Sequence, residues 1–247
     1  MLSLERCCEV VEHEIGRLAE VTAGVDPATP VPTCDGWTIA DLLTHTGEVF
    51  LWAARIVREQ APKRIPRDEI DWGVPNDPTQ LPAWIGRGAA TVLESFRSSD
   101  PEAPMWAWGW PKLGSFWPRR MVHEVGVHRA DAELALGLVP TFEPEVAADG
   151  IDELLDNLPQ AAYFAPAVAD LRGSGTLDLH APDAGTSWLI TLVEDGFRWE
   201  RTEAIGTDVE VTAAAGDLLL AMYGRPAAFE VGGDVALWDR WVRDSAI

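Results

Sequence analysis

The hydrophobic period of the chain changes near residue 169, and this change constrains the fold more than any other feature of the sequence. Up to about residue 158, apolar residues recur three or four positions apart, which is the spacing of amphipathic helices. From about Ala169, segments such as TLDLHA and DVEVTA alternate apolar with polar residues, which is the spacing of half-buried strands. The sequence therefore predicts an α+β protein of two domains, a helical domain at residues 1–158 and a small α+β domain at residues 170–247.

Start and stop signals divide the helical domain into five expected helices. Thr38, with Asp41 three residues later, forms an acidic variant of the capping box, and Gly137 followed by Pro140 ends a later helix. The inward-facing apolar stripes favour an up-and-down four-helix bundle. The expected helices cover residues 3–23, 38–60, 80–98, 116–137 and 144–157. Two further helical segments, GDLLLAMYG and DVALWDRWVRD, are expected after the strands.

The charge of the chain argues against polyanionic partners. There are 19 Lys and Arg against 40 Asp and Glu, which gives a net charge of −21. Such a charge repels nucleic acid and anionic membranes, so we expect neither as a partner. No apolar run approaches the roughly 20 residues that span a bilayer, and the charges of the first residues come too early for a signal peptide. We therefore expect a cytoplasmic protein. The sequence carries no signal for its oligomeric state.

The three cysteines, Cys7, Cys8 and Cys34, do not form a disulfide framework, because the count is odd and adjacent cysteines are badly placed to bridge each other. We interpret them as reduced thiols packed as small apolar groups, with metal ligation by Cys34 as a minor alternative.

Two candidate metal ligands share the inward face of the helix expected at 116–137. At 100° per residue, Glu124 and His128 fall on its apolar stripe one turn apart, where two side chains can converge on one ion. His45 lies on the flank of the stripe of the helix at 38–60 and can point into the same interior. Two imidazoles and one carboxylate leave the fourth position of a tetrahedral site open, as in catalytic zinc sites.

Spacing alone leaves other interpretations of these residues open. An inward histidine can be a satisfied core residue, and this set of ligands also accepts nickel, iron(II) or manganese. Asp131 either accepts a hydrogen bond from a metal ligand or is a solvated charge. His123 falls nearly opposite the stripe and is expected outside the site. His13 and His180 are expected to be surface or satisfied residues.

Two segments of the bundle resemble the signature stretches of a known family. CDGWTIADLLTHTGE and FWPRRMVHEVGVHRADAE are similar to those of the mycothiol-dependent maleylpyruvate isomerase family, a branch of the DinB-like four-helix metalloproteins. The resemblance implies that His45, Glu124 and His128 bind zinc. It extends loosely over the whole chain, because the C-terminal α+β domain of the family ends in a pattern matched here by Gly224, Arg225, Val231, Gly233, Asp234, Leu237 and Trp241.

The resemblance also implies a cosubstrate and a reaction. Mycothiol, a low-molecular-weight thiol, would bind the open zinc position as a thiolate and add to an electrophilic small molecule. In an isomerase the addition would convert a cis double bond, such as that of maleylpyruvate, to the trans form. In an S-transferase the thiol would stay attached to the product. Arg225 matches the family's Gly-Arg position and is the candidate for holding a substrate carboxylate, with an exposed turn as the alternative.

The run MWAWGWPKLGSFW either walls an apolar pocket or packs in the core; its four tryptophans are Trp106, Trp108, Trp110 and Trp117. Two other classes of function stay open on the same bundle. One is a binding protein that has lost turnover, and the other is a hydrolase in which the metal activates water.

Overall fold

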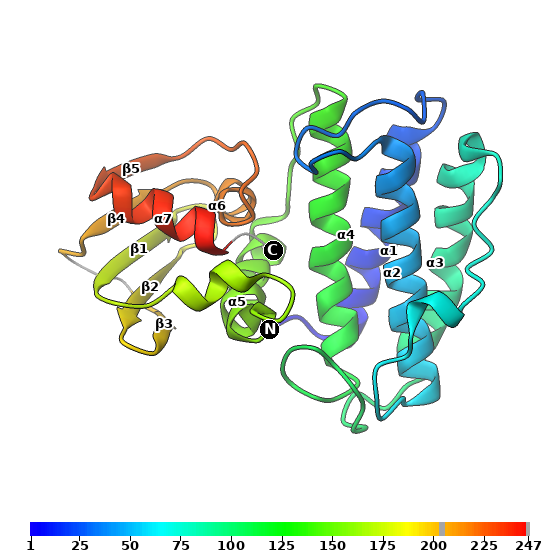
Figure 1. The fold of residues 1–247 in the computed structure, drawn as a ribbon, viewed down its shortest axis with the longest axis horizontal. Helices are drawn as coiled ribbons and strands as arrows, with labels where there is room; N and C mark the ends of the chain where they lie inside the picture. The colour runs from blue at the N-terminus through cyan, green and yellow to red at the C-terminus, as the bar shows by residue number, and fades with distance from the viewer. Residues whose placement is uncertain (203–205, 246–247) are drawn as a thin grey trace. The chain divides into compact units, whose positions relative to one another are not determined.

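The computed structural model describes residues 1–202 and 206–245 and divides into two compact units (Figure 1). The first unit is Met1–Pro140 and is helical, and the second is Thr141–Ile247 and contains a β-sheet with helices. This confirms the predicted α+β class and the order of its parts along the chain. The last two residues of the expected second domain lie outside the described residues.

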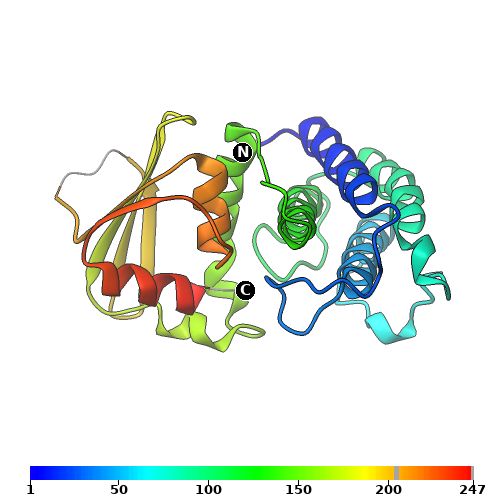
Figure 2. The same ribbon diagram turned by 90° about the horizontal axis from the view of Figure 1, so that it is seen from above.

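Within residues 1–140, four α-helices form a closed bundle (Figure 2). Helix α1 packs against α3 and α4, and α2 packs against the same two neighbours, so each helix contacts two others. The helix bounds are Leu4–Thr22 for α1, Ile39–Glu59 for α2, Leu81–Arg97 for α3 and Phe116–Ala135 for α4. Each bound lies within two residues of the sequence-based range.

Local signals explain where two of these helices begin and end. The Ser3 hydroxyl accepts a hydrogen bond from the Arg6 amide at 3.2 Å and caps α1. The capping box of Thr38 and Asp41 is present at the start of α2, as predicted. At the other end, Gln60 adopts a left-handed conformation with φ 45° and closes α2.

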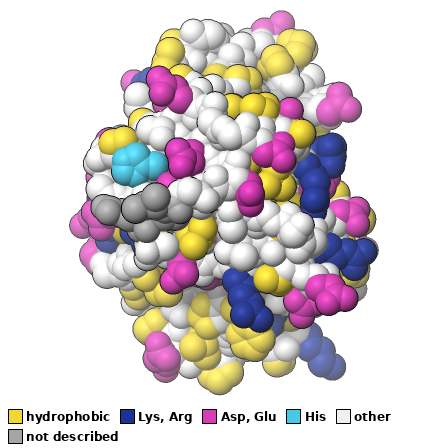
Figure 3. Space-filling model, turned by 90° about the vertical axis from the view of Figure 1, so that its left-hand side faces the viewer, with side chains coloured by type: hydrophobic (Ala, Val, Ile, Leu, Met, Phe, Trp, Pro, Cys, Tyr) yellow, Lys and Arg dark blue, Asp and Glu magenta, His cyan; other side chains and the backbone are white. Residues whose placement is uncertain are grey.

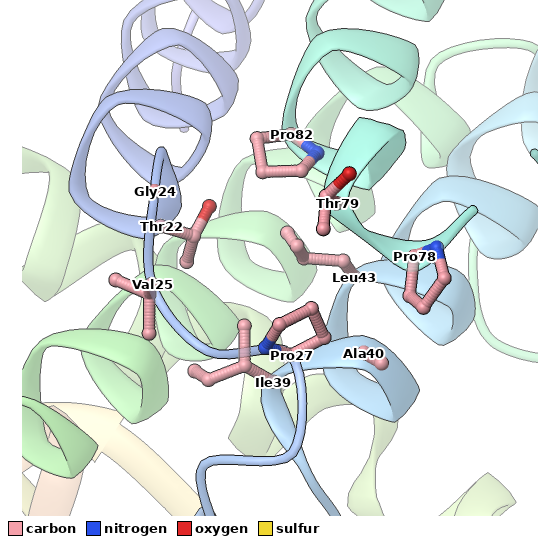
Figure 4. Close-up of a pocket in the computed structure, with 10 residues that line it drawn as sticks. All are labelled: Thr22, Gly24, Val25, Pro27, Ile39, Ala40, Leu43, Pro78, Thr79 and Pro82. Carbon is pink, nitrogen blue, oxygen red and sulfur yellow. The ribbon is translucent and has the colours of Figure 1, made fainter.

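The bundle does not alternate strictly up and down. A pocket of about 90 Å³ brings together Thr22 at the end of α1, Ile39 at the start of α2 and Pro82 at the start of α3 (Figure 4). Helices α2 and α3 therefore begin at the same end of the bundle and run parallel. The reason is the long connection at residues 60–80, which returns along the bundle before α3 begins (Figure 1). It contains two short 3₁₀ segments, Arg67–Glu69 (η1) and Pro78–Gln80 (η2).

The described part of the second unit contains a five-stranded sheet in the order β3-β2-β1-β4-β5. The β1–β4 pair is parallel, and the other three pairs are antiparallel. The strands are β1 Gly175–Ala181, β2 Thr186–Val193, β3 Gly196–Arg201, β4 Val209–Thr212 and β5 Glu230–Gly233. The helices are α5 Pro144–Ala161, α6 Ala215–Met222 and α7 Val235–Ser245, and Pro166–Asp170 forms a 3₁₀ segment, η3.

The fifth helix, α5, lies in the second unit and packs against α6 and η3. The sequence-based boundary at residue 158 places this helix with the bundle, so the structure and the expectation differ by one helix. The periodicity of α5 reports only that one face is buried and not which core buries it. Strand β5 was not predicted, because four residues of which two are glycine carry almost no strand signal.

The charge distribution can be seen on the face of the second unit in Figure 3, where acidic side chains occur over the whole face and lie between the basic ones. None of the helices in the described residues combines the length and the apolarity that a membrane span requires.

Candidate metal centre

Three side chains from α2 and α4 converge inside the first unit. His45 Nε2 lies 3.3 Å from Glu124 Oε1, and His128 Nε2 lies 3.6 Å from the same oxygen. The three donor atoms lie within 4.8 Å of one another. The i, i+4 spacing of Glu124 and His128 places both on one face of α4, as the sequence indicated. The structure thus brings the three predicted ligands together.

The donors fit a tetrahedral metal ion. With zinc–ligand bonds of about 2.0–2.1 Å, two ligands of a tetrahedron are about 3.3–3.4 Å apart. The two distances around Glu124 Oε1, 3.3 Å and 3.6 Å, are close to that edge length, and the third donor separation is within 4.8 Å. Two imidazoles and a carboxylate are also the donor set of catalytic zinc sites that keep one position open. The residues present therefore fit a divalent ion such as zinc.

Neighbouring side chains hold two of these ligands in orientation. The second carboxylate oxygen of Glu124, Oε2, accepts a hydrogen bond from Arg120 Nη2 at 3.0 Å. The other oxygen, Oε1, therefore faces the two imidazoles. His128 Nδ1 lies 3.0 Å from Asp131 Oδ2. Asp131 is fully buried, so it is not the solvated charge that the sequence left open. Its hydrogen bond directs His128 Nε2 toward the site.

The charges of the three residues are coupled. Burial by itself raises the pKa of the Glu124 carboxyl, but hydrogen bonds from His128 and His45 and the charge of Arg120 outweigh burial, and this pKa lies well below its usual value. Burial lowers the pKa of His128, but hydrogen bonds with Asp131, Cys34 and Glu124 outweigh that effect and hold the pKa well above 6.5. The raised pKa favours a proton on His128 when no ion is bound. An ion that binds must displace this proton.

Two residues of the loop before α2 complete the surroundings, and periodicity gave no signal for either. Cys34 Sγ donates a weak hydrogen bond to Asp131 Oδ2 at 3.4 Å, and Cys34, His128 and Asp131 form a second group of potential ligands. The Trp37 ring centroid lies 4.8 Å from that of His45 and 5.9 Å from that of His128. Trp37 therefore covers one side of the pair of imidazoles.

The other histidines lie outside these groups of potential ligands. His123 belongs to neither group, although it is on the same helix as Glu124 and His128. His13 is exposed on α1, and His180 Nδ1 lies 2.8 Å from the hydroxyl oxygen of Ser187 on the neighbouring strand. These positions agree with the expectations for all three histidines.

The tryptophan run is mostly packing. Trp117 is 1% exposed and contacts the rings of Trp52 and Trp106 at centroid distances of 5.5 Å and 5.8 Å. Trp110, in contrast, is 58% exposed. Trp108 has the Arg120 guanidinium 5.8 Å from its ring centroid, so it supports the arginine that orients Glu124.

Arg225 lies in the second unit, in the turn after α6. It is half-buried, and its Nη1 donates to the Tyr223 carbonyl oxygen at 2.7 Å. Together with Phe229, Trp238 and Arg243 it lines a groove of about 450 Å³. Its assignment to a substrate carboxylate stays a prediction.

Comparisons with known proteins agree with the resemblance seen in the two bundle segments. The family model described as "Mycothiol maleylpyruvate isomerase N-terminal domain" matches residues 9–133, and the "MDMPI C-terminal domain" model matches residues 145–240. The gap between the two matches contains the division of the structure at Pro140. No curated protein matches the chain.

Two crystal structures of the mycothiol-dependent maleylpyruvate isomerase share the fold. A histidine-to-alanine mutant aligns with a TM-score of 0.65 at 16% identity, and a second structure of the isomerase aligns with a TM-score of 0.61 at 18% identity. Each alignment covers 94% of this chain and 93% of the other. On the evidence of the two family matches, which together span most of the sequence, this chain belongs to the mycothiol-dependent maleylpyruvate isomerase family.

Proposed function

We propose that this protein is a zinc-dependent and mycothiol-dependent enzyme of the maleylpyruvate isomerase type, which adds a thiolate to an electrophilic small molecule in the cytoplasm. The observation that carries the proposal is the convergence of His45, Glu124 and His128 with donor spacings that suit one tetrahedral ion. Zinc bound there would lower the pKa of a coordinated thiol, so that the thiolate nucleophile is available at neutral pH.

The residues of the chain have distinct roles in this proposal. Arg120 and Asp131 hold Glu124 and His128 in the geometry of ligands, and Trp37 limits the access of water from one side. Arg225 anchors a carboxylate of the substrate through bidentate hydrogen bonds. Its bond to the Tyr223 carbonyl restricts the rotamers of the guanidinium and so lowers the entropy lost on binding.

The covalent steps distinguish an isomerase from an S-transferase. Addition of the sulfur to one carbon of the cis double bond moves its electron pair onto the conjugated carbonyl, and the former double bond can then rotate. Return of the electron pair expels the thiolate and restores the double bond in the trans form, so an isomerase releases the thiol unchanged. A transferase protonates the adduct instead and releases the conjugate.

The first test is the metal content of protein purified without a histidine tag. We expect near-stoichiometric zinc in the wild type and its loss in His45→Ala, whose side chain is 31% exposed and therefore contributes little to the core. The matched control is His13→Ala, which removes an exposed histidine from α1 and should retain zinc.

The second test is turnover of maleylpyruvate with and without mycothiol. Isomerised acid with unchanged thiol supports the isomerase, and a stable conjugate supports the transferase. Hydrolysis of an ester or amide without thiol would indicate a hydrolase in which the metal activates water. A folded wild type that cannot be loaded with zinc contradicts the catalytic proposal and leaves a binding protein.

A further inference from the structure

A second group of potential ligands uses the other nitrogen of the His128 ring. Cys34 Sγ and His128 Nδ1 lie 3.4 Å and 3.0 Å from the same oxygen, Asp131 Oδ2. The donor atoms of this group lie within 4.8 Å of one another. His128 Nε2, in contrast, lies 3.6 Å from Glu124 Oε1. The two nitrogens of one imidazole therefore face two different sets of donors.

Two parts of the chain position this second group. Cys34 lies in the loop before α2, where its amide donates to the Val31 carbonyl and its carbonyl accepts from the Trp37 amide, both at 3.0 Å. His128 and Asp131 lie about one turn apart on α4, and Asp131 is fully buried. Because backbone hydrogen bonds hold the loop on both sides of Cys34, its sulfur is placed beside the carboxylate before any ion binds.

The spacing and chemistry of these donors suit an ion with an affinity for sulfur. With zinc bonds of about 2.3 Å to sulfur and about 2.1 Å to oxygen, the two donors of a tetrahedron are about 3.6 Å apart. The distance from Cys34 Sγ to Asp131 Oδ2, 3.4 Å, is close to that value. The distance from His128 Nδ1 to the same oxygen, 3.0 Å, is about 0.4 Å shorter than the corresponding nitrogen–oxygen edge. Thiolate ligands favour soft ions, whereas the first group consists of nitrogen and oxygen donors.

The two groups compete for His128. A neutral imidazole has an acceptor lone pair on one nitrogen, and the other nitrogen carries the proton. An ion bound at Nδ1 therefore leaves Nε2 as an N–H group, which can donate to Glu124 but cannot bind a second ion. The ion also replaces the proton of the Cys34 thiol, which passes to solvent, because cysteine binds metals as the thiolate.

We propose that Cys34, His128 and Asp131 form a second metal site, which captures thiophilic divalent ions such as cadmium and excludes an ion from the centre of His45, Glu124 and His128. Capture at this site requires no enzymatic activity. Only the release of zinc that follows from it rests on the proposed function.

The first test is titration of the metal-free protein with cadmium, because a cadmium–thiolate bond gives a charge-transfer absorption in the ultraviolet. We expect this absorption in the wild type and its loss in Cys34→Ser. Cys7→Ala is the matched control, since Cys7 is a buried thiol of α1 outside both groups of ligands, and this variant should keep the absorption. Circular dichroism establishes that each variant is folded.

Two further measurements distinguish a second site from a fourth ligand to the first ion. In His45→Ala the absorption should persist, because His45 belongs only to the first group. In the zinc-loaded wild type, cadmium should release zinc as the absorption grows. The apparent cadmium affinity should fall about tenfold for each tenfold rise in free zinc once the zinc site is saturated, as competition requires.

Persistence of the absorption in Cys34→Ser would overturn the proposal. Its loss in folded His45→Ala would also overturn it and would make Cys34 a ligand of the first centre. Simultaneous binding of cadmium and zinc would refute the competition for His128. A protein that binds cadmium through Cys34 but never binds zinc would support the second site and contradict the proposed function.

Discussion

A single carboxylate oxygen, Asp131 Oδ2, accepts hydrogen bonds from both His128 and Cys34. Asp131 has no exposed surface, so its charge is compensated by these donors and by its other surroundings and not by bulk water. The hydrogen bond to His128 favours the protonated imidazole when no ion is bound, and it favours the ligand tautomer when an ion is bound. Asp131 therefore affects both the affinity for the ion and its dependence on pH.

Asp131→Asn should change both properties. Because the pKa of His128 is raised, we expect the zinc affinity of the wild type to keep increasing as pH rises above 6.5, where the last protons leave His128. The variant removes the negative charge that raises this pKa, while the amide oxygen can still accept a hydrogen bond from His128, so its affinity should reach a plateau at lower pH. The plateau should be about 10–100-fold weaker, because a neutral amide orients His128 less firmly and makes it a less basic ligand.

Competition with a chromogenic chelator across the range from about pH 6 to pH 9 measures both effects. Asp35→Asn is the control, because it makes the same chemical change at an exposed position in the loop next to Cys34. An Asp131→Asn curve that coincides with that of Asp35→Asn would refute the orienting role.

The sequence predicted part of the candidate site for a definable reason. Glu124, His128 and His45 lie on helices, where regular spacing converts sequence separation into direction. Cys34 and Trp37 lie in the loop before α2. The path of this loop is set by backbone hydrogen bonds such as those from the Val31 amide to the Trp37 carbonyl and from the Ile39 amide to the Thr29 carbonyl, and no period describes it. The sequence left ligation by Cys34 open as an alternative, but the structure was needed to place either residue beside the imidazoles.

At the scale of elements, replacing glycine by alanine should change the free energy of unfolding in opposite directions at two helical positions. A Cβ at Gly47 of α2 would overlap the Trp84 ring, whereas a Cβ at Gly16 of α1 would meet nothing within 4 Å. Gly47→Ala should lower the free energy of unfolding by about 1–3 kcal/mol through overpacking. Gly16→Ala should raise it by about 0.5–1 kcal/mol, because alanine loses less backbone entropy in a helix. Urea unfolding followed by circular dichroism compares them, and changes of the same sign would contradict the close α2–α3 packing.

An ion-pair network joins α1 to α4. Arg129 Nε lies 2.6 Å from Glu14 Oε2, and Arg129 Nη1 lies 2.6 Å from Glu133 Oε2. All three residues are buried. Burial by itself lowers the pKa of Arg129, but the two carboxylates outweigh it and raise the pKa. The arginine is therefore charged in the native protein and depends on both partners.

Glu14→Ala should destabilise the bundle by about 3 kcal/mol, because it leaves a buried guanidinium with one of its carboxylate partners missing. Glu12→Ala, at an exposed position of the same helix, should change the stability by less than about 0.5 kcal/mol. Thermal and chemical unfolding of both variants would measure the difference. Similar stabilities would show that the network contributes no net energy to the pairing of α1 with α4.

Elements were predicted from the sequence more completely than their arrangement. Helix bounds follow from caps and periodicity, which are local, and they agree closely with the structure. The parallel course of α2 and α3 depends on how residues 60–80 return along the bundle, and the pairing of β4 between β1 and β5 depends on contacts far apart in sequence. Local patterns do not encode either of these.

At the scale of the whole molecule, the position of α5 decides where the chain can be divided. Its apolar residues Ile151, Leu154 and Leu158 are fully buried, and the helix packs against α6 within the second unit. A fragment of residues 1–158 would carry this apolar stripe without its partner, and a fragment of residues 1–140 would not.

We expect the fragment 1–140 to be monodisperse and to bind zinc, and the fragment 1–158 to self-associate through the exposed stripe. Size-exclusion chromatography with light scattering, together with circular dichroism and metal analysis, tests both. A well-behaved 1–158 fragment that is more stable than 1–140 would instead assign α5 to the bundle.

His45 and Glu124 are 79 positions apart in the chain, and all of α3 and the tryptophan run lie between them. An ion held by both would act as a cross-link that closes this long loop. By analogy with a disulfide, closing a loop of this length lowers the conformational entropy of the unfolded chain. This raises the free energy of unfolding by on the order of 4 kcal/mol. Removing the ion would then lower the free energy of unfolding of the whole bundle, including α3, a helix that contributes no ligand, so a chelator would act on the bundle as a reductant acts on a disulfide-bonded protein.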